Sequence, residues 1–158
     1  MNKTAGFTLI ELMVVIAIIG FLAAWGLPAL TQMTQRSDVA TDTNRLLALM
    51  QYARSEAVTN KQTVTVCSST NGATCAGDTN WNQAVIVLQN ANVLRSTSII
   101  TSENTISLDA GGATELTFNA DGTASAASVT VCALPGIGDR QINVNGSGQA
   151  RSGVIVCP

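Results

Sequence analysis

The run Gly6-Phe7-Thr8-Leu9-Ile10-Glu11-Leu12-Met13-Val14-Val15-Ile16 decides how the first part of this chain folds. It follows a short leader whose single cation is Lys3, and the apolar character continues to about Leu30. A segment that is apolar nearly all round predicts a hydrophobic transmembrane helix, or a helix in the core of an assembly, over residues 7–30. One acid, Glu11, interrupts the run, and a charged side chain at the centre of a membrane helix costs roughly 2.5–3.5 kcal/mol. We therefore expect Glu11 to meet a partner cation.

The pattern changes twice beyond residue 30. Residues 31–60 stay helical but become amphipathic, with an apolar stripe at steps of three and four formed by Val39, Thr43, Leu46, Met50, Ala53 and Ala57. From residue 61 the period is two, and strands are expected over residues 62–67, 84–88, 93–95, 105–108, 115–119, 128–132, 141–144 and 153–157. The predicted fold class is α+β, with one long N-terminal helix followed by an antiparallel β-rich domain over residues 61–158.

Composition excludes several classes of function. Lys and Arg total 8 against 10 Asp and Glu, so the net charge of −2 does not favour nucleic acid, and any such site must be a local patch. The chain has no His, which removes the commonest catalytic acid–base group near neutral pH and a common zinc ligand. We therefore expect no catalytic residues, no metal and no cofactor, and the chain is not expected to be an enzyme.

Four cysteines, Cys67, Cys75, Cys132 and Cys157, follow the apolar segment. They form no Cys-x-x-Cys pair, and such a set beyond a membrane-targeting segment indicates two disulfides in an oxidising compartment, rather than free thiols or a metal site. Sequence alone allows three connectivities. The most local one is preferred: Cys67 with Cys75 in the loop after the same strand, and Cys132 with Cys157 at the ends of two similar segments that are expected to be neighbouring strands.

The N-terminal run resembles the class III signal of type IV prepilins. A conventional secretory signal should instead end in a small-residue cleavage site of the Ala-x-Ala kind, which is not found where the run ends. The resemblance implies that a prepilin peptidase cuts between Gly6 and Phe7, removing residues 1–6, and that Phe7 is then N-methylated. It also implies that Glu11 pairs with the terminal amine of a neighbouring subunit. The protein would first span the bacterial inner membrane once, with its domain in the periplasm, and then enter an extracellular fibre.

The segment Ala53-Arg54-Ser55-Glu56-Ala57 is similar to one at the end of the long helix in the GspH/FimT/FimU group of minor pilins and pseudopilins. The resemblance implies that the helix packs on a β-domain of two sheets. It further implies a minor type IV pilin that helps to initiate the fibre at or near its tip, together with other minor pilins and the major pilin. A type II secretion pseudopilin is the alternative. Arg54 and Glu56 are interpreted as a solvated helix end, a subunit contact or a clasp onto the β-domain.

A second alternative is a DNA-binding minor pilin for natural transformation. FimT-type proteins, which this chain resembles near its C-terminus, carry a Gly-Arg-x-Arg motif on a late loop. The matching stretch here is Gly148-Gln149-Ala150-Arg151, so Gln149 stands where the first arginine would be. One guanidinium and one neutral amide offer half the charge toward phosphate. Arg140 and Lys61 are candidates for completing the patch.

Overall fold

The computed structural model describes residues 7–98, 104–133 and 136–157, with only the backbone described for residues 25–29. Within these residues the chain forms one helix, α1 (Leu9–Asn60), followed by eight strands. It divides into two compact units, Met1–Thr34 and Gln35–Pro158, so α1 contributes residues to both. The α+β fold class predicted from the sequence is confirmed, and the helix ends at the residue expected.

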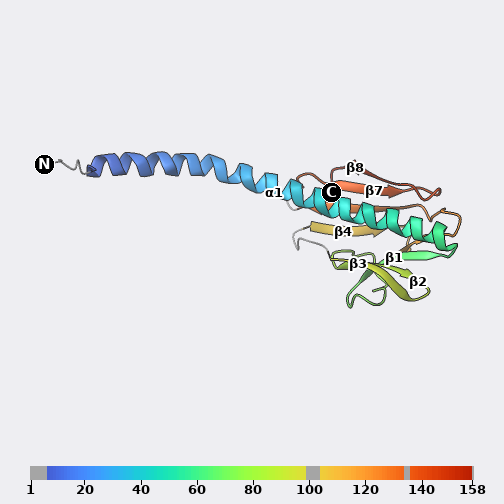
Figure 1. The fold of residues 1–158 in the computed structure, drawn as a ribbon. Coiled ribbons are helices and arrows are strands. Elements are labelled where there is room, and N and C mark those ends of the chain that lie inside the picture. The colour runs from blue at the N-terminus through green and yellow to red at the C-terminus, as the bar shows by residue number, and fades with distance from the viewer. Residues whose placement is uncertain (1–6, 99–103, 134–135, 158) are drawn as a thin grey trace. The chain divides into compact units, whose positions relative to one another are not determined.

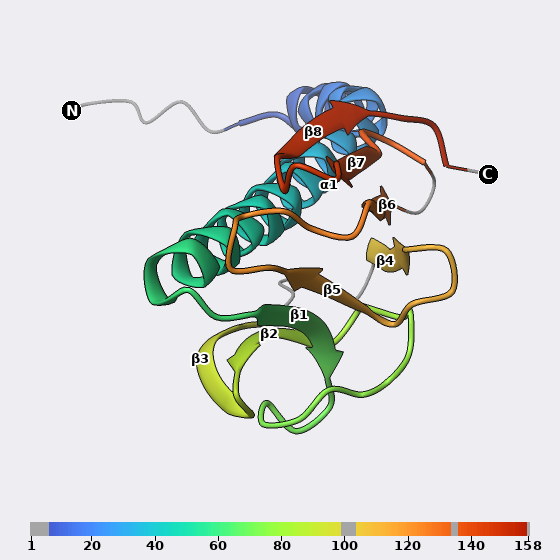
Figure 2. The same ribbon diagram turned by 90° about the vertical axis from the view of Figure 1, so that its right-hand side faces the viewer.

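The strands of the second unit form two antiparallel sheets of four strands each among the described residues (Figure 1). The first sheet has the order β3-β2-β1-β5, and its strands are β1 (Val64–Ser69), β2 (Ala84–Gln89), β3 (Asn92–Thr97) and β5 (Glu115–Phe118). The second has the order β4-β6-β7-β8, with β4 (Asn104–Asp109), β6 (Ala127–Ala133), β7 (Arg140–Val144) and β8 (Ala150–Val154). Figures 1 and 2 show β3 and β8 on opposite sides of this unit.

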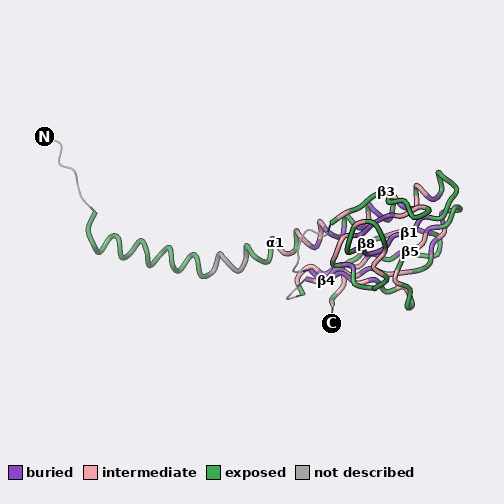
Figure 3. The backbone as a smooth tube through the Cα atoms, turned by 90° about the horizontal axis from the view of Figure 1, so that it is seen from below, coloured by how far each residue is buried: buried purple, intermediate pink, exposed green. Residues whose placement is uncertain are grey.

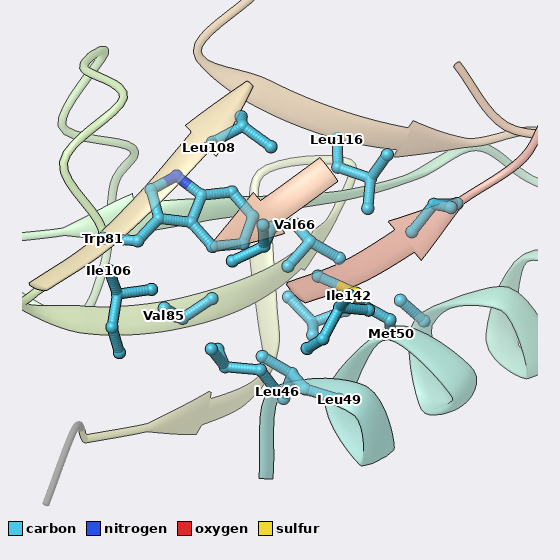
Figure 4. Packing of buried hydrophobic residues seen from close by; sticks show 14 of the residues in the cluster. Leu46, Leu49, Met50, Val66, Trp81, Val85, Ile106, Leu108, Leu116 and Ile142 are labelled. Atoms are coloured by element: carbon cyan, nitrogen blue, oxygen red, sulfur yellow. The ribbon is translucent and has the colours of Figure 1, made fainter. Parts of the chain in front are cut away.

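The core of the second unit lies where the apolar stripe of α1 meets both sheets. Figure 3 shows the buried segments gathered in this unit, and Figure 4 shows α1 side chains packed among side chains of the strands. Leu46, Met50 and Ala53 of the stripe are fully buried. Asp42 is buried with them, and it accepts a hydrogen bond from Asn104 Nδ2 at 2.9 Å. The amphipathic pattern predicted for residues 31–60 therefore corresponds to a helix face that closes the core.

The last strand differs from the prediction. Residues 153–157 were expected to be a strand, but β8 begins at Ala150 and pairs with β7 from Val144↔Ala150 to Arg140↔Val154. The difference arises in the connection, because Asn145 organises a turn through its side chain. Its Oδ1 accepts from Gln149 N at 2.9 Å, and its carbonyl accepts from Gly148 N at 2.8 Å. Such side-chain-to-backbone bonds let Asn replace regular pairing with a turn, so the strand starts directly after Gln149.

Arg54 fastens α1 to two turns of the β-domain. Its Nε donates to the carbonyl of Gly122 at 3.1 Å, and its Nη2 donates to the carbonyl of Ser147 at 3.0 Å. Gly122 lies in the turn between β5 and β6, where the hydroxyl and then the amide of Thr123 donate to Asp121 and lower the pKa of that carboxyl. Of the roles considered for Arg54, the structure shows the clasp onto the β-domain.

The two turns held by Arg54 also touch each other through backbone. Gly148 has a φ of +73°, a left-handed conformation that favours glycine. A Cβ placed on Gly148 would lie 2.0 Å from the Gly122 carbonyl oxygen and 3.0 Å from Arg54 Nε. The glycine is thus required by the close approach of another turn as well as by its own backbone conformation.

We predict that Gly148→Ala destabilises the fold by about 2–3 kcal/mol, because it combines a strained φ with a clash against backbone. Urea denaturation of the purified full chain in non-ionic detergent, followed by near-ultraviolet circular dichroism, measures the change. Gly146→Ala is the matched control, since a Cβ there meets nothing within 4 Å and Gly146 does not have a left-handed φ. Equal stability of the two variants would contradict the proposed role of the Gly122–Gly148 contact.

Candidate functional site

The start of α1 is capped by Thr8. The Thr8 hydroxyl oxygen accepts a hydrogen bond from the Glu11 amide at 3.3 Å, and the Thr8 carbonyl accepts from the Leu12 amide at 3.2 Å. Thr8 and Glu11 have the spacing of a capping box, in which an acid occupies the third helical position. A negative charge in the first turn also suits the positive end of the helix dipole. Glu11 is therefore placed at the helix start by local chemistry, directly after Phe7.

The side chains around Glu11 have little to pack against within their own unit. Every large apolar residue described from Phe7 to Leu22 is exposed, from 43% for Val15 to 81% for Phe7. Glu11 is exposed as well, and it has no cationic partner among the described residues. Gly6, the other predicted processing residue, lies outside the described residues. No helix in the described part of the chain has a stretch long and apolar enough to cross a membrane.

Both disulfides have the pairing expected from the sequence, Cys67–Cys75 and Cys132–Cys157. The reason given for the second pairing was wrong, however. The segments that end at Cys132 and Cys157 are not neighbouring strands, because β7 lies between β6 and β8, and Cys157 follows the end of β8. The chain after β8 returns toward the end of β6 instead.

Asp139 holds the segment after β8 against the end of β6. Its carboxylate is buried and accepts from Ala133 N at 3.0 Å and from Cys157 N at 3.1 Å, while its carbonyl accepts from Ile155 N at 3.1 Å. One side chain thus joins the residue after Cys132 to Cys157 itself. Sequence reasoning missed Asp139, because nothing in the local pattern distinguishes it from an exposed turn residue.

A cavity of about 270 Å³ lies beside the Gly148–Arg151 stretch. It is lined by Gln51 and Arg54 of α1 and by Gly148, Gln149, Ala150 and Arg151. Arg151 Nη2 lies 3.4 Å from Gln149 Oε1, to which it donates. Arg54 therefore supplies a second guanidinium next to Arg151, although position 149 has no charge. From the sequence, Arg54 was interpreted only as part of the segment at the end of the helix, and its position near Arg151 was not predicted.

The other two predicted DNA contacts do not join this cavity. Arg151 pairs with Asn143, whereas Arg140 pairs with Val154, and positions three apart along a strand point to opposite faces of the sheet. Lys61 follows the end of α1 with a φ of 51° and does not line the cavity. Among the described residues, no group of three His, Cys, Asp or Glu side chains is close enough to hold a metal ion.

Two family models match this chain. Residues 42–148 match the family described as type II transport protein GspH, and residues 1–27 match the prokaryotic N-terminal methylation motif. A fimbrial protein of Pseudomonas aeruginosa is 42% identical over 64 residues, which cover 40% of this chain and 42% of that protein. The type IV major alpha-pilin of Moraxella bovis is 52% identical over 48 residues, 30% of each chain. The chain thus spans less than half the length of these curated relatives.

Solved structures share the fold. The type IV minor pilin FimU of Pseudomonas aeruginosa superposes with a TM-score of 0.60 at 21% identity, covering 80% of this chain and 92% of FimU. The minor pseudopilin EpsH of the Vibrio cholerae type 2 secretion system gives a TM-score of 0.53 at 10% identity, covering 75% and 97%. The GspH match extends from Asp42 in α1 to the Gly148 turn, which includes Arg54 and every described strand except β8. The chain belongs to the GspH family.

Proposed function

We propose that this protein is a minor subunit of a type IV pilus, inserted in the bacterial inner membrane through residues 7–30 before it enters the fibre. The observation that carries the proposal is the exposed apolar surface from Phe7 to Leu22, among which Glu11 has no cationic partner within the described residues. Apolar side chains of this number are stable only in lipid or against other subunits. The prepilin peptidase and its methyl transfer would act at Gly6 and Phe7, since the methylation motif covers residues 1–27.

Glu11 is the residue proposed to select the neighbour. Cleavage after Gly6 would create an amine at Phe7, a cation at the start of every mature subunit. A carboxylate in an apolar environment is stabilised most when it pairs with such a cation, because the interaction strengthens as water is excluded. Glu11 of one subunit would therefore pair with the Phe7 amine of the next, with the apolar residues of both helices packed around them.

The proposed place of the subunit is at or near the fibre tip, where it takes part in initiating assembly with other minor pilins before the major pilin is added. The resemblance to the FimU group supports this role. The fimbrial relatives support a pilus over a secretion pseudopilus, although the family also contains type II secretion proteins. A pseudopilin of a type II secretion system is the alternative function.

We predict that Glu11→Ala inserts normally but enters the fibre poorly, by about tenfold or more, because loss of a partly desolvated charge pair costs at least about 1.4 kcal/mol. The measurement is the amount of this subunit in sheared pili relative to the membrane fraction of a deletion strain complemented with each variant. Glu56→Gln serves as the control, since it also removes a carboxylate from α1, but one that accepts from Asn60 Nδ2 at 2.9 Å in the second unit. If Glu11→Ala entered the fibre as well as the wild-type protein, the proposed pairing would be refuted.

The deletion strain also separates the two functions. If deleting this subunit abolished protein secretion and left piliation unchanged, the pseudopilin function would be favoured.

DNA binding is a second candidate function, and the cavity shared by Arg54 and Arg151 is the observation that favours it. Phosphate oxygens accept from guanidinium groups in bidentate geometry. Arg54 already donates Nε and Nη2 to two carbonyls, which leaves part of its fork for a ligand. With so few cations, binding is proposed to be weak and dependent on salt.

We predict that the full chain binds duplex DNA at physiological salt no more tightly than about 10⁻⁴ M, the weak end of non-specific binding. Gln149→Arg should tighten binding and steepen its salt dependence by about one phosphate contact, whereas Arg151→Gln should abolish it. Fluorescence anisotropy at several salt concentrations gives both quantities. Arg140→Gln is the control, because Arg140 points to the other face of the sheet and should have no effect. If the Arg140 and Arg151 variants lose binding equally, the cavity is not the DNA site.

A further inference from the structure

A second cavity of about 270 Å³ lies between α1 and β3. Figure 1 shows β3 on the opposite side of α1 from β8, whose residues line the first cavity. It is lined by Arg45, Ala48 and Leu49 from α1 and by Arg95, Ser96 and Thr97 from β3. Two arginines thus share one small cavity in a chain with only 8 Lys and Arg residues and a net charge of −2. Neither arginine lines the cavity of the proposed DNA site.

The two guanidinium groups lack acidic partners within the described residues. Arg45 Nη1 donates to the carbonyl of Ser98 at 3.5 Å, and the Arg95 guanidinium carbon lies 5.1 Å from the centre of the Tyr52 ring. Burial, followed by the charge of Glu56 and a hydrogen bond to it, raises the pKa of Tyr52, so the phenol is neutral. Like charges around one cavity repel each other, and a carboxylate entering the cavity relieves that repulsion. The cavity therefore favours an anion.

The backbone of β3, which lies beside the cavity, has an outer edge that no described strand covers. β3 is the outermost strand of its sheet, and no described strand pairs with its outer side. Its side chains are exposed or half-buried, and Arg95 pairs with the core residue Val87, which directs both to the face of the sheet that α1 covers. An edge strand presents unpaired N–H and C=O groups at the spacing of an extended chain. The β3 edge can therefore pair with the backbone of an extended chain, and the adjacent cavity can bind a charged side chain of the same chain.

We propose that an acidic, extended segment of a partner protein adds to β3 as a further antiparallel or parallel strand and places a carboxylate side chain between Arg45 and Arg95. Main-chain hydrogen bonds to the β3 edge supply affinity in this mode of recognition, and the side-chain cavity supplies specificity. Planar guanidinium groups suit a carboxylate, because two parallel N–H bonds meet its two oxygens. The proposal does not depend on whether the chain serves a pilus or a secretion pseudopilus.

A peptide fits this surface better than a nucleic acid does. A nucleic acid needs cations along its path, whereas the ionisable groups described next to Arg95 are Tyr52, whose pKa is raised, and the acid Glu56 beside Tyr52. Phosphodiester groups also carry no N–H donors to pair with the carbonyl groups of an edge strand. A single carboxylate on an extended backbone uses both the arginines and the strand edge.

The test uses the full ¹⁵N-labelled chain in non-ionic detergent and a short capped peptide of alternating Thr and Val with one central Glu. Nuclear magnetic resonance titration should show amide shifts along β3 and at the Arg45 and Arg95 side chains. Binding should fall about tenfold or more when the peptide carries Gln in place of Glu, since one charge-assisted pair is lost. Arg45→Gln and Arg95→Gln should each cause a similar loss. Arg151→Gln, on the other flank, should leave the affinity unchanged.

Two further outcomes would overturn the proposal. One is that the Glu peptide causes no Glu-specific change, because it binds with the same affinity as the Gln peptide or shifts no β3 amide. The other is that oligodeoxythymidine binds with loss on Arg45→Gln and Arg95→Gln while the peptide does not, which would assign the cavity to nucleic acid. Circular dichroism spectra of the two variants, compared with that of the wild-type chain, exclude misfolding as the cause of any loss.

Discussion

The β-domain depends on the apolar stripe that α1 presents to both sheets at once. Each sheet buries one face, and in the described structure the stripe fills the space at which those faces meet, with Leu46 and Met50 fully buried. Ala53 and Ala57 are fully buried too, and their short side chains let the helix backbone approach closely. Without this stripe the apolar faces of Val66, Val85 and Ile142 would meet water, so helix and sheets are stable together rather than separately.

Polar contacts hold the turns and the C-terminal segment of the β-domain against this core. Arg54 holds the Gly122 and Ser147 turns to the helix, and Asp139 joins the C-terminal return to the end of β6 beside the Cys132–Cys157 disulfide. Both are charged groups that bond backbone atoms of turns, where regular pairing cannot satisfy every N–H and C=O. The domain thus needs few surface ion pairs, in keeping with its low content of charged residues.

Four arginine side chains lie in two cavities, one on each flank of α1. Arg54 and Arg151 share one cavity, and Arg45 and Arg95 share another beside the edge of β3. The face of α1 between them carries Ala48, Gln51 and Ser55, which are small or uncharged. In the proposed fibre, α1 could therefore pack closely against neighbouring subunits while the two arginine pairs stay on its flanks.

The sequence by itself determined the helix, its two kinds of surface and the β-rich domain, because these follow from periodicities of 3.6 and two residues that are local properties. It also indicated Glu11 as an acid that requires a partner, and the local pairing of the cysteines. The first residue of β8 was not predictable in the same way, since it depends on the Asn145 side chain forming a turn. Only the tertiary structure brought Arg54 to Gly122 and Gly148, separated Arg140 from Arg151 on opposite faces, and placed Arg95 beside Arg45. These contacts join residues tens of positions apart, and their existence depends on strand order and register, which no local pattern encodes.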